Sequence, residues 1–126
     1  MAAKRILLVD DEDDVREVAR MSLEMMGGFE VLPASSGAEA LERAERERPD
    51  AIVMDVMMPG MDGPTTFRAL RENPATRPIP VILLTAKVQS TGRAGLQALG
   101  VDGVLTKPFD PLTLAREVSD LLGWGL

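Results

Sequence analysis

The chain contains neither cysteine nor histidine among its 126 residues. Without cysteine it can form no disulfide, and it offers neither a thiol nucleophile nor a thiolate ligand for a metal. Without histidine it has no serine–histidine catalytic pair, no imidazole metal ligand and no histidine of its own to phosphorylate. Any metal ion that it binds must therefore be a hard cation with oxygen ligands, such as Mg²⁺. These absences exclude most classes of enzyme.

Long apolar runs and an excess of basic residues are also missing. No run approaches the roughly 18 apolar residues of a membrane span, and the four apolar residues after Arg5 are too few for a signal peptide. The net charge of −6 and the pI near 4.6 argue against a surface for nucleic acid, because phosphate backbones attract basic proteins. We therefore expect a cytoplasmic protein that binds neither a membrane nor a nucleic acid directly.

What the chain does contain is an alternation of short apolar runs and helical patterns. Its apolar content of 45% and charged content of 27% are typical of a soluble domain, here one domain over residues 1–126. The apolar runs predict strands at 5–9, 29–34, 51–54, 80–84 and 103–106. The periodic segments predict helices at 14–26, 36–49, 63–74, 88–99 and 111–122. Five such units predict an α/β fold, with a doubly wound parallel sheet covered on both faces.

The spacing of apolar residues also predicts how the helices pack. In the first helix the residues expected to face the sheet are Val15, Val18, Ala19, Leu23 and Met26. In the last helix, which Pro111 is expected to open, they are Leu112, Ala115, Val118 and Leu122. Pro33 places its strand at an edge of the sheet. Gly92 and Gly95 each cost roughly 1 kcal/mol against alanine, so we expect the fourth helix to be loosely held.

Polar residues follow four of the predicted strands, at the ends where open α/β sheets bind their ligands. The first strand ends in Asp10 and Asp11, the third in Asp55, the fourth in Thr85 and the fifth in Lys107. Taken singly, each of these residue types is also common in a purely structural role. Aspartate and threonine often cap the following helix, as Asp13 or Asp14 is expected to do, and a lone lysine usually lies on the surface. Nearby, Met54 and Met58 are expected to fill the core.

Taken together, the residues at this edge have a chemical purpose. Two carboxylates about 4 Å apart repel each other by roughly 4 kcal/mol at an effective dielectric constant of 20. Three of them require a cation, and Mg²⁺ with oxygen ligands suits them. Lys107 adds a fixed positive charge. Such a site suits a phosphoryl group, and a carboxylate in it can act as a nucleophile to give an aspartyl phosphate.

Four segments in order, ILLVDDEDDVRE, DAIVMDVMMPGMDG, PVILLTA and VLTKPF, resemble the receiver domain of two-component response regulators. The resemblance covers a core from Lys4 to Leu122, and no output domain is expected in this chain. It implies a (βα)5 flavodoxin-like fold with strand order 2-1-3-4-5. It also implies a phosphoacceptor that is not a turnover enzyme, with Mg²⁺ as cofactor.

The resemblance assigns a role to each residue of the edge. Asp55 is implied to be the phosphoacceptor. Asp11, Asp55 and the backbone carbonyl of Met57 are implied to ligate Mg²⁺, and Asp10 to act mainly through water.

Further roles follow for the residues around the phosphoryl group. Lys107 and the Thr85 hydroxyl are implied to bind phosphoryl oxygens, together with the backbone N–H groups of Met57 and Ala86. The peptide before Pro108 is expected to be cis. Pro59 and Gly63 are expected to shape the loop after Asp55.

The chain departs from the family at the position that usually reports phosphorylation together with the threonine. The aromatic residue expected three positions before the lysine is Val104, so the usual threonine–aromatic signal lacks its ring. Met57 and Lys87 lie where side chains flank the phosphoryl group, and we hypothesise that the apolar Met57 slows autodephosphorylation.

The leading prediction is a phosphorelay switch. A sensor histidine kinase or histidine phosphotransfer protein would donate the phosphoryl group, and an unknown downstream protein would read the result. A phosphorylation-dependent dimer is compatible with it. The alternative is an interaction module that needs no phosphorylation. A phosphohydrolase is disfavoured because Met57 stands where its second aspartate belongs, and a flavin protein because acids follow the first strand. Trp124 is expected to pack on the last helix.

Overall fold

The fold is a parallel sheet of five strands with helices on both faces. The computed structural model describes residues 3–86 and 90–125. Its strands are β1 (Arg5–Val9), β2 (Glu30–Ala34), β3 (Ala51–Asp55), β4 (Val81–Thr85) and β5 (Gly103–Thr106). Its helices are α1 (Asp13–Gly27), α2 (Gly37–Glu47), α3 (Gly63–Glu72), α4 (Ser90–Gln97) and α5 (Leu114–Leu122). The strand order β2-β1-β3-β4-β5 confirms the predicted topology.

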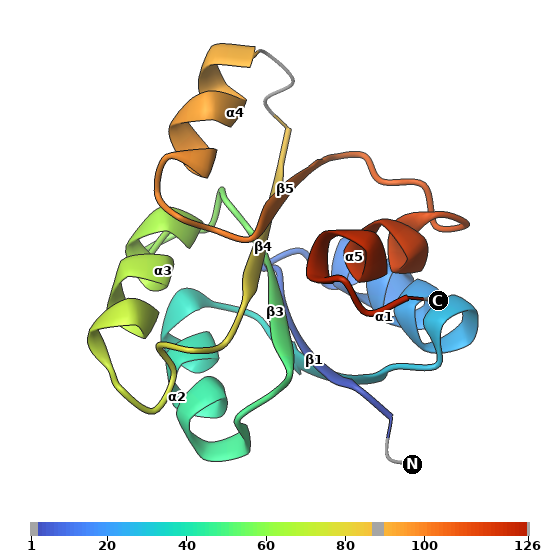
Figure 1. The fold of residues 1–126 in the computed structure, drawn as a ribbon, viewed down its shortest axis with the longest axis horizontal. Coiled ribbons are helices and arrows are strands. Elements are labelled where there is room, and N and C mark those ends of the chain that lie inside the picture. The colour runs from blue at the N-terminus through green and yellow to red at the C-terminus, as the bar shows by residue number, and fades with distance from the viewer. Residues whose placement is uncertain (1–2, 87–89, 126) are drawn as a thin grey trace.

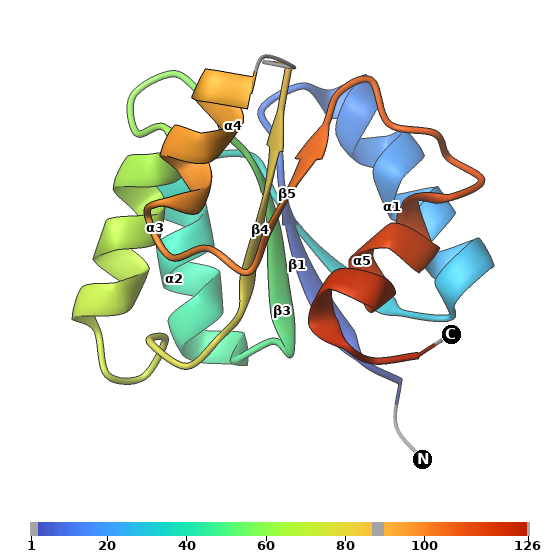
Figure 2. The same cartoon turned by 45° about the horizontal axis from the view of Figure 1, so that its top comes forward.

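Two hydrophobic cores lie on the two faces of the sheet. Helices α1 and α5 cover one face, and α2, α3 and α4 cover the other (Figures 1 and 2). Successive strand residues point to opposite faces, so Leu8 and Val53 join the core under α1 and α5. Leu7 and Met54 join the core under α2 and α3, as predicted for Met54. Both faces of the central strands are therefore buried.

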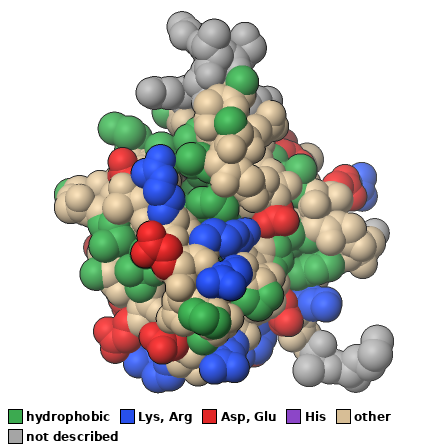
Figure 3. All heavy atoms as spheres, turned by 60° about the vertical axis from the view of Figure 1, so that its left-hand side comes forward, with side chains coloured by type: hydrophobic (Ala, Val, Ile, Leu, Met, Phe, Trp, Pro, Cys, Tyr) green, Lys and Arg blue, Asp and Glu red, His purple; other side chains and the backbone are tan. Residues whose placement is uncertain are grey.

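The edges and ends of the fold are closed by local contacts. Pro33 lies in the edge strand β2, as predicted, and its carbonyl accepts a hydrogen bond of 2.6 Å from Arg43. Trp124 was predicted to pack on the last helix; its ring lies edge-to-face on Phe29 at 5.6 Å, against the core that α1 and α5 cover. On the face that carries α3 and α4, acidic and basic side chains are interspersed with apolar ones (Figure 3). No helix among residues 3–86 and 90–125 is long and apolar enough to cross a membrane.

Three predictions about α1 are wrong. Val18 and Met26 are about half exposed instead of facing the sheet, because the buried stripe of α1 is narrow and follows Ala19, Ser22 and Leu23. Neither Asp13 nor Asp14 caps the helix, since both lie within it and Glu12 takes the cap position.

The start of α5 also differs from the prediction. The helix begins at Leu114, not at Pro111, because the carboxylate of Asp110 accepts a hydrogen bond from the Leu112 N–H and holds residues 111–113 in a turn. Leu112 is consequently 72% exposed and does not share the buried face of α5. An apolar side chain therefore remains on the surface beside α1.

The start of α3 lies directly against the end of β3. A side chain at Gly63 would place its Cβ 2.7 Å from the carbonyl oxygen of Asp55, and the Gly63 N–H donates to Val56 at 2.9 Å. The Asp62 carboxylate caps the helix by accepting from the Thr65 N–H at 2.8 Å. Gly63 therefore lets a helix begin against the backbone of Asp55, and so fixes the loop that follows this residue.

Candidate functional site

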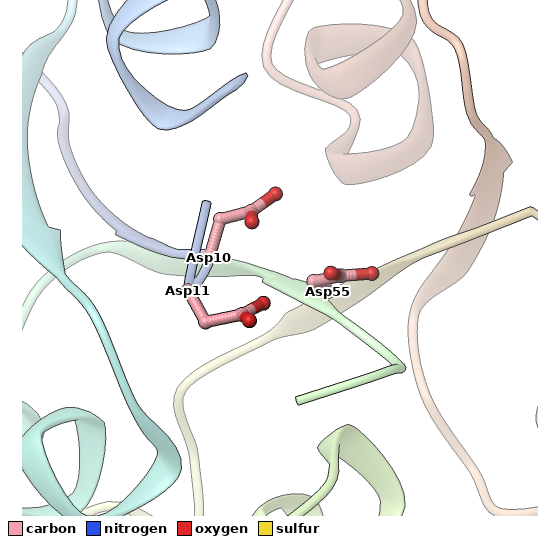
Figure 4. A group of neighbouring side chains, drawn as sticks. All are labelled: Asp10, Asp11 and Asp55. Atoms are coloured by element: carbon pink, nitrogen blue, oxygen red, sulfur yellow. The ribbon is translucent and has the colours of Figure 1, made fainter. Parts of the chain in front are cut away.

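Three carboxylates meet at the carboxyl ends of β1 and β3. Oxygens of Asp10, Asp11 and Asp55 lie within 4.8 Å of one another. Figure 4 shows the three side chains next to one another, with their carboxylates extending in the same direction. The sheet brings them together because β1 and β3 are neighbours with Val9 opposite Met54, so Asp10, which follows β1, lies level with Asp55, the last residue of β3. The predicted convergence of the three acids is confirmed.

Lys107 reaches this cluster from the end of β5. Its Nζ lies 3.0 Å from Asp10 Oδ2 and 3.3 Å from Asp55 Oδ2, and its side chain is 15% exposed. Its backbone N–H donates to the carbonyl of Thr85 at 2.8 Å, and its peptide bond to Pro108 is cis, the geometry expected from the resemblance. Lys107 is therefore no ordinary surface lysine, because it pairs with two buried acids.

Burial and charge shift the pKa values of this pair in a consistent way. Burial raises the pKa of Asp55 above its ordinary value, and the charge of Asp10 adds to the increase, although Lys107 opposes it. Burial alone would lower the pKa of Lys107, but the hydrogen bond with Asp10 and the charges of both acids outweigh it, so this pKa is raised. The lysine therefore stays protonated, and Asp55 is a more basic carboxylate than one in water.

Asp10 is the most constrained of the three acids. Its Oδ1 accepts from the Glu12 N–H at 2.9 Å and its Oδ2 faces Lys107, while its own N–H donates to Ala34 at 3.1 Å. Asp55 is held more loosely at Oδ1, where the Met57 N–H lies 3.4 Å away. Of the two buried acids, Asp55 therefore has the longer contacts at its carboxylate oxygens, 3.3 and 3.4 Å against 2.9 and 3.0 Å for Asp10.

The other predicted residues lie around this edge as follows. Thr85 ends β4 and is 1% exposed, and Ala86 follows it at the surface. Val104 is buried in β5, opposite Leu83. The side chain of Met57 is 69% exposed. Lys87 lies outside the described residues.

One residue of the site was not predicted from the sequence. Arg16, in the first turn of α1, donates a hydrogen bond of 2.7 Å to the carbonyl oxygen of Asp10. The signal that could have found it is its position, because a cation in the first turn of a helix opposes the helix dipole.

The donor set fits a hard divalent cation. Three carboxylates within 4.8 Å offer oxygen ligands alone, which is the preference of Mg²⁺. Lys107 supplies only one positive charge against three acids, so the cluster retains an excess of negative charge that a divalent cation would neutralise.

An apolar groove of about 450 Å³ lies beside the cluster. Lys107 and Ala86 belong to its lining, which α1 and the loop before α5 complete. Its other lining residues are Asp14, Val15, Val18, Pro108, Phe109 and Pro111. The groove therefore connects the surface of α1 with the charged site.

The family model described as "Response regulator receiver domain" matches residues 6–119. The chain belongs to the response regulator receiver family. This receiver is 40% identical over 119 residues to the alkaline phosphatase synthesis transcriptional regulatory protein PhoP of Bacillus subtilis, and 46% identical over 120 residues to the response regulator PleD of Caulobacter vibrioides. These matches cover 94% and 93% of the chain, but 48% and 26% of the two relatives. The chain thus spans half or less of the length of these curated relatives.

Solved structures agree with this assignment. The chemotaxis response regulator CheY4 of Vibrio cholerae matches with a TM-score of 0.88 and 32% identity, over 95% of this chain and 99% of that one. The receiver domain of a sensor histidine kinase from Pseudomonas aeruginosa, with a magnesium ion in its active site cleft, matches with a TM-score of 0.85 and 34% identity over 97% and 99%. Receivers of both kinds therefore share the fold of this chain.

Proposed function

We propose that this receiver accepts a phosphoryl group on Asp55, in a Mg²⁺-dependent reaction that changes its affinity for a protein partner. The observation that carries the proposal is the position of Asp55, which is buried beside two acids with Lys107 Nζ 3.3 Å from its carboxylate. The chain would serve as an acceptor in signalling and not as a turnover enzyme.

Asp55 is the best nucleophile of the three acids. Asp10 has a hydrogen-bond or ionic partner at each carboxylate oxygen, and Asp11 is the most exposed of the three. Asp55 combines a raised pKa with a weakly held Oδ1, so a basic lone pair is available there. One oxygen of Asp55 would attack phosphorus while the bond from phosphorus to the donor nitrogen breaks, which leaves an acyl phosphate on the receiver.

The other residues would bind the phosphoryl group and the ion. Asp11 and Asp55 would ligate Mg²⁺ together with the Met57 carbonyl, and Asp10 would act mainly through water. Bound Mg²⁺ would neutralise negative charge on the transferring group. Lys107, protonated because its pKa is raised, would pair with one phosphoryl oxygen, and the Thr85 hydroxyl and the N–H of Ala86 would bind others.

The phosphoryl donor must be another protein or a small molecule, because the chain has no histidine. A sensor histidine kinase or a histidine phosphotransfer protein is the donor expected for a receiver. The apolar groove that leads along α1 to Lys107 supports this, since a partner bound there would lie next to the acceptor.

An interaction module without phosphorylation is the second candidate, and Val104 favours it. In the family, a threonine and an aromatic ring together report phosphorylation, whereas here the position of the ring is a buried valine. The module would keep the fold and the partner surface but would form no adduct.

The test is intact mass after incubation with a small acyl phosphate, with and without Mg²⁺, for the wild type and Asp55→Asn. We expect one phosphoryl group on the wild type only, and only with Mg²⁺. Beryllofluoride binding in the presence of Mg²⁺ covers the case of a short-lived adduct. If neither the adduct nor beryllofluoride binding is detected, the proposal fails and the interaction module replaces it.

A further inference from the structure

Arg16 makes one contact within its helix and one outside it. Its Nη2 pairs with Asp13 Oδ1 at 2.6 Å, an ordinary pairing of neighbours three residues apart. Its Nη1 donates at 2.7 Å to the carbonyl oxygen of Asp10, which precedes α1. The contact with Asp13 is exposed to water, because the Asp13 side chain is 85% exposed, whereas the contact with the Asp10 carbonyl is partly buried. The guanidinium therefore links the first turn of α1 to the end of β1.

The position of this arginine has an electrostatic cost, which the exposed pairing with Asp13 offsets only in part. A cation in the first turn faces the positive end of the helix dipole, which costs about 0.3–1 kcal/mol. Arg20, one turn further on, offers a comparison because it pairs with Glu17 and Glu24 of the same helix. The contact that distinguishes Arg16 from Arg20 is the one with the Asp10 carbonyl.

That carbonyl belongs to the peptide that joins Asp10 to Asp11. The orientation of this peptide plane determines where the chain directs Asp11, because a planar peptide turns as a unit. In the preceding peptide, the Asp10 N–H donates a hydrogen bond of 3.1 Å to the carbonyl of Ala34 in β2. Arg16, in α1, donates a hydrogen bond to the Asp10 carbonyl. The peptides on both sides of the Asp10 Cα are thus each held by a hydrogen bond, and the one that leads to Asp11 is held by Arg16.

We infer that Arg16 is a positioning residue, which holds the Asp10–Asp11 peptide so that the Asp11 carboxylate stays directed at the site shared with Asp55. The inference rests on the proposed function, since it concerns the residues proposed to hold Mg²⁺. Within residues 3–86 and 90–125, no hydrogen bond or ion pair joins Arg16 to Asp11 or Asp55, so Arg16 acts through the backbone of Asp10.

A positioning role and a purely electrostatic role for Arg16 predict opposite results for Mg²⁺ affinity. If Arg16 acts only through its charge, its removal makes the potential at the cluster more negative and Mg²⁺ binds more tightly. If Arg16 positions Asp11, its removal lets the peptide turn and Mg²⁺ binds more weakly. Loss of a residue that orients a metal ligand typically weakens metal binding by about tenfold or more.

The experiment is calorimetric titration of the full chain with MgCl₂ for the wild type, Arg16→Met and Arg20→Met. Arg20→Met is the matched control, because it removes the same charge from the same helix without touching Asp10. We expect the Kd for Mg²⁺ to rise about tenfold in Arg16→Met and to change by less than about twofold in Arg20→Met. An unchanged or lower Kd in Arg16→Met would overturn the inference.

Arg16→Lys keeps the charge but cannot donate to Asp10 and Asp13 with one rigid fork, so its Kd should lie between those of the wild type and Arg16→Met. If Arg16→Met does not fold, Arg16→Lys takes its place in the test. A Kd of Arg16→Lys equal to that of the wild type then overturns the inference. A Tm within a few degrees of the wild type, measured in EDTA, shows that the effect concerns the site. If the wild type itself binds no Mg²⁺, the proposed function fails and the inference with it.

Discussion

The two sides of the sheet edge differ in how closely the chain is packed around the site. On the side of β1 and β3, α3 begins so close to Asp55 that only glycine fits at position 63, and Asp10 is held at its N–H, its carbonyl and both carboxylate oxygens. On the side of β4 and β5, α4 presents Ala94, Gly95 and Gln97 to solvent, and nothing lies within 4 Å of a Cβ built on Gly95.

This difference matches the two tasks of a phosphorylation switch. Nucleophile and metal ligands have to be held in place, because small displacements of reacting groups are costly. A surface that changes on phosphorylation must instead have two arrangements of similar free energy, and such segments come from the less stable parts of a fold. The proposed nucleophile and metal ligands therefore lie on the closely packed β1–β3 side, and the more open α4 lies on the β4–β5 side, which also contributes Lys107 and Thr85 to the site.

The largest expected effect comes from a methyl group on the packed side. Gly63→Ala places its Cβ 2.7 Å from the backbone oxygen of Asp55, and backbone cannot move aside as a side chain does. We expect a loss of about 2 kcal/mol in the free energy of unfolding, together with weaker Mg²⁺ binding. Urea unfolding measures the first effect and calorimetry the second. Wild-type stability in this variant would show that the loop adapts and that the β1–β3 side is not rigidly packed.

The second effect is electrostatic and depends on pH. The pKa of Asp55 is raised in the folded chain, so ionised Asp55 destabilises the fold when the pH is above this pKa. The destabilisation disappears when the pH falls below the pKa of an aspartate in the unfolded chain, which is about 4. Asp55→Asn should therefore stabilise the protein at pH 7 by about 1 kcal/mol in EDTA. The gain should decline as the pH falls toward 4.

Asp62→Asn is the matched control for this prediction. The pKa of Asp62 is lowered, first by the hydrogen bond from the Thr65 N–H, so its ionised form stabilises the fold and its stabilisation is lost as the pH falls. The amide variant should therefore lower the Tm at pH 7, with the opposite sign to Asp55→Asn. Equal signs for the two variants would contradict the raised pKa of Asp55.

The contrast between the two sides was only partly predictable from the sequence. Asp10, Asp11, Asp55 and Lys107 could be placed together, because each follows a strand and the carboxyl ends of parallel strands share one edge. The role of Gly63 in close packing and the bond from Arg16 to Asp10 could not, since both depend on distances between segments. The exposure of Val18 and Leu112 was missed because apolar spacing predicts a helix face but not whether a neighbour covers it.

The third effect tests the open side with the same chemical change as the first. Gly95→Ala adds a methyl group into open space in α4, at a position without a positive φ. Alanine is favoured over glycine in a helix by roughly 0.8 kcal/mol, so the free energy of unfolding should rise by up to this amount. Amide hydrogen exchange should slow in α4 and stay unchanged in α1. Opposite signs for Gly63→Ala and Gly95→Ala would establish the packing difference, and a loss of stability in both would remove it.

The smallest expected effect concerns the exposed part of the packed side. Met57 follows Asp55 by two residues, and its side chain is 69% exposed, so it could cover a phosphoryl group only from the solvent side. We propose that it slows the entry of water, so that Met57→Ser hydrolyses its acyl phosphate about threefold faster, equivalent to about 0.7 kcal/mol in the barrier. Loss of the phosphoprotein band over time after removal of the donor measures this rate.

Met25→Ser is the control, because Met25 is 78% exposed on α1 and far along the helix from Asp10, and it should leave the rate unchanged. An equal rate in Met57→Ser and the wild type would show that the Met57 side chain does not control the lifetime of the phosphoryl group.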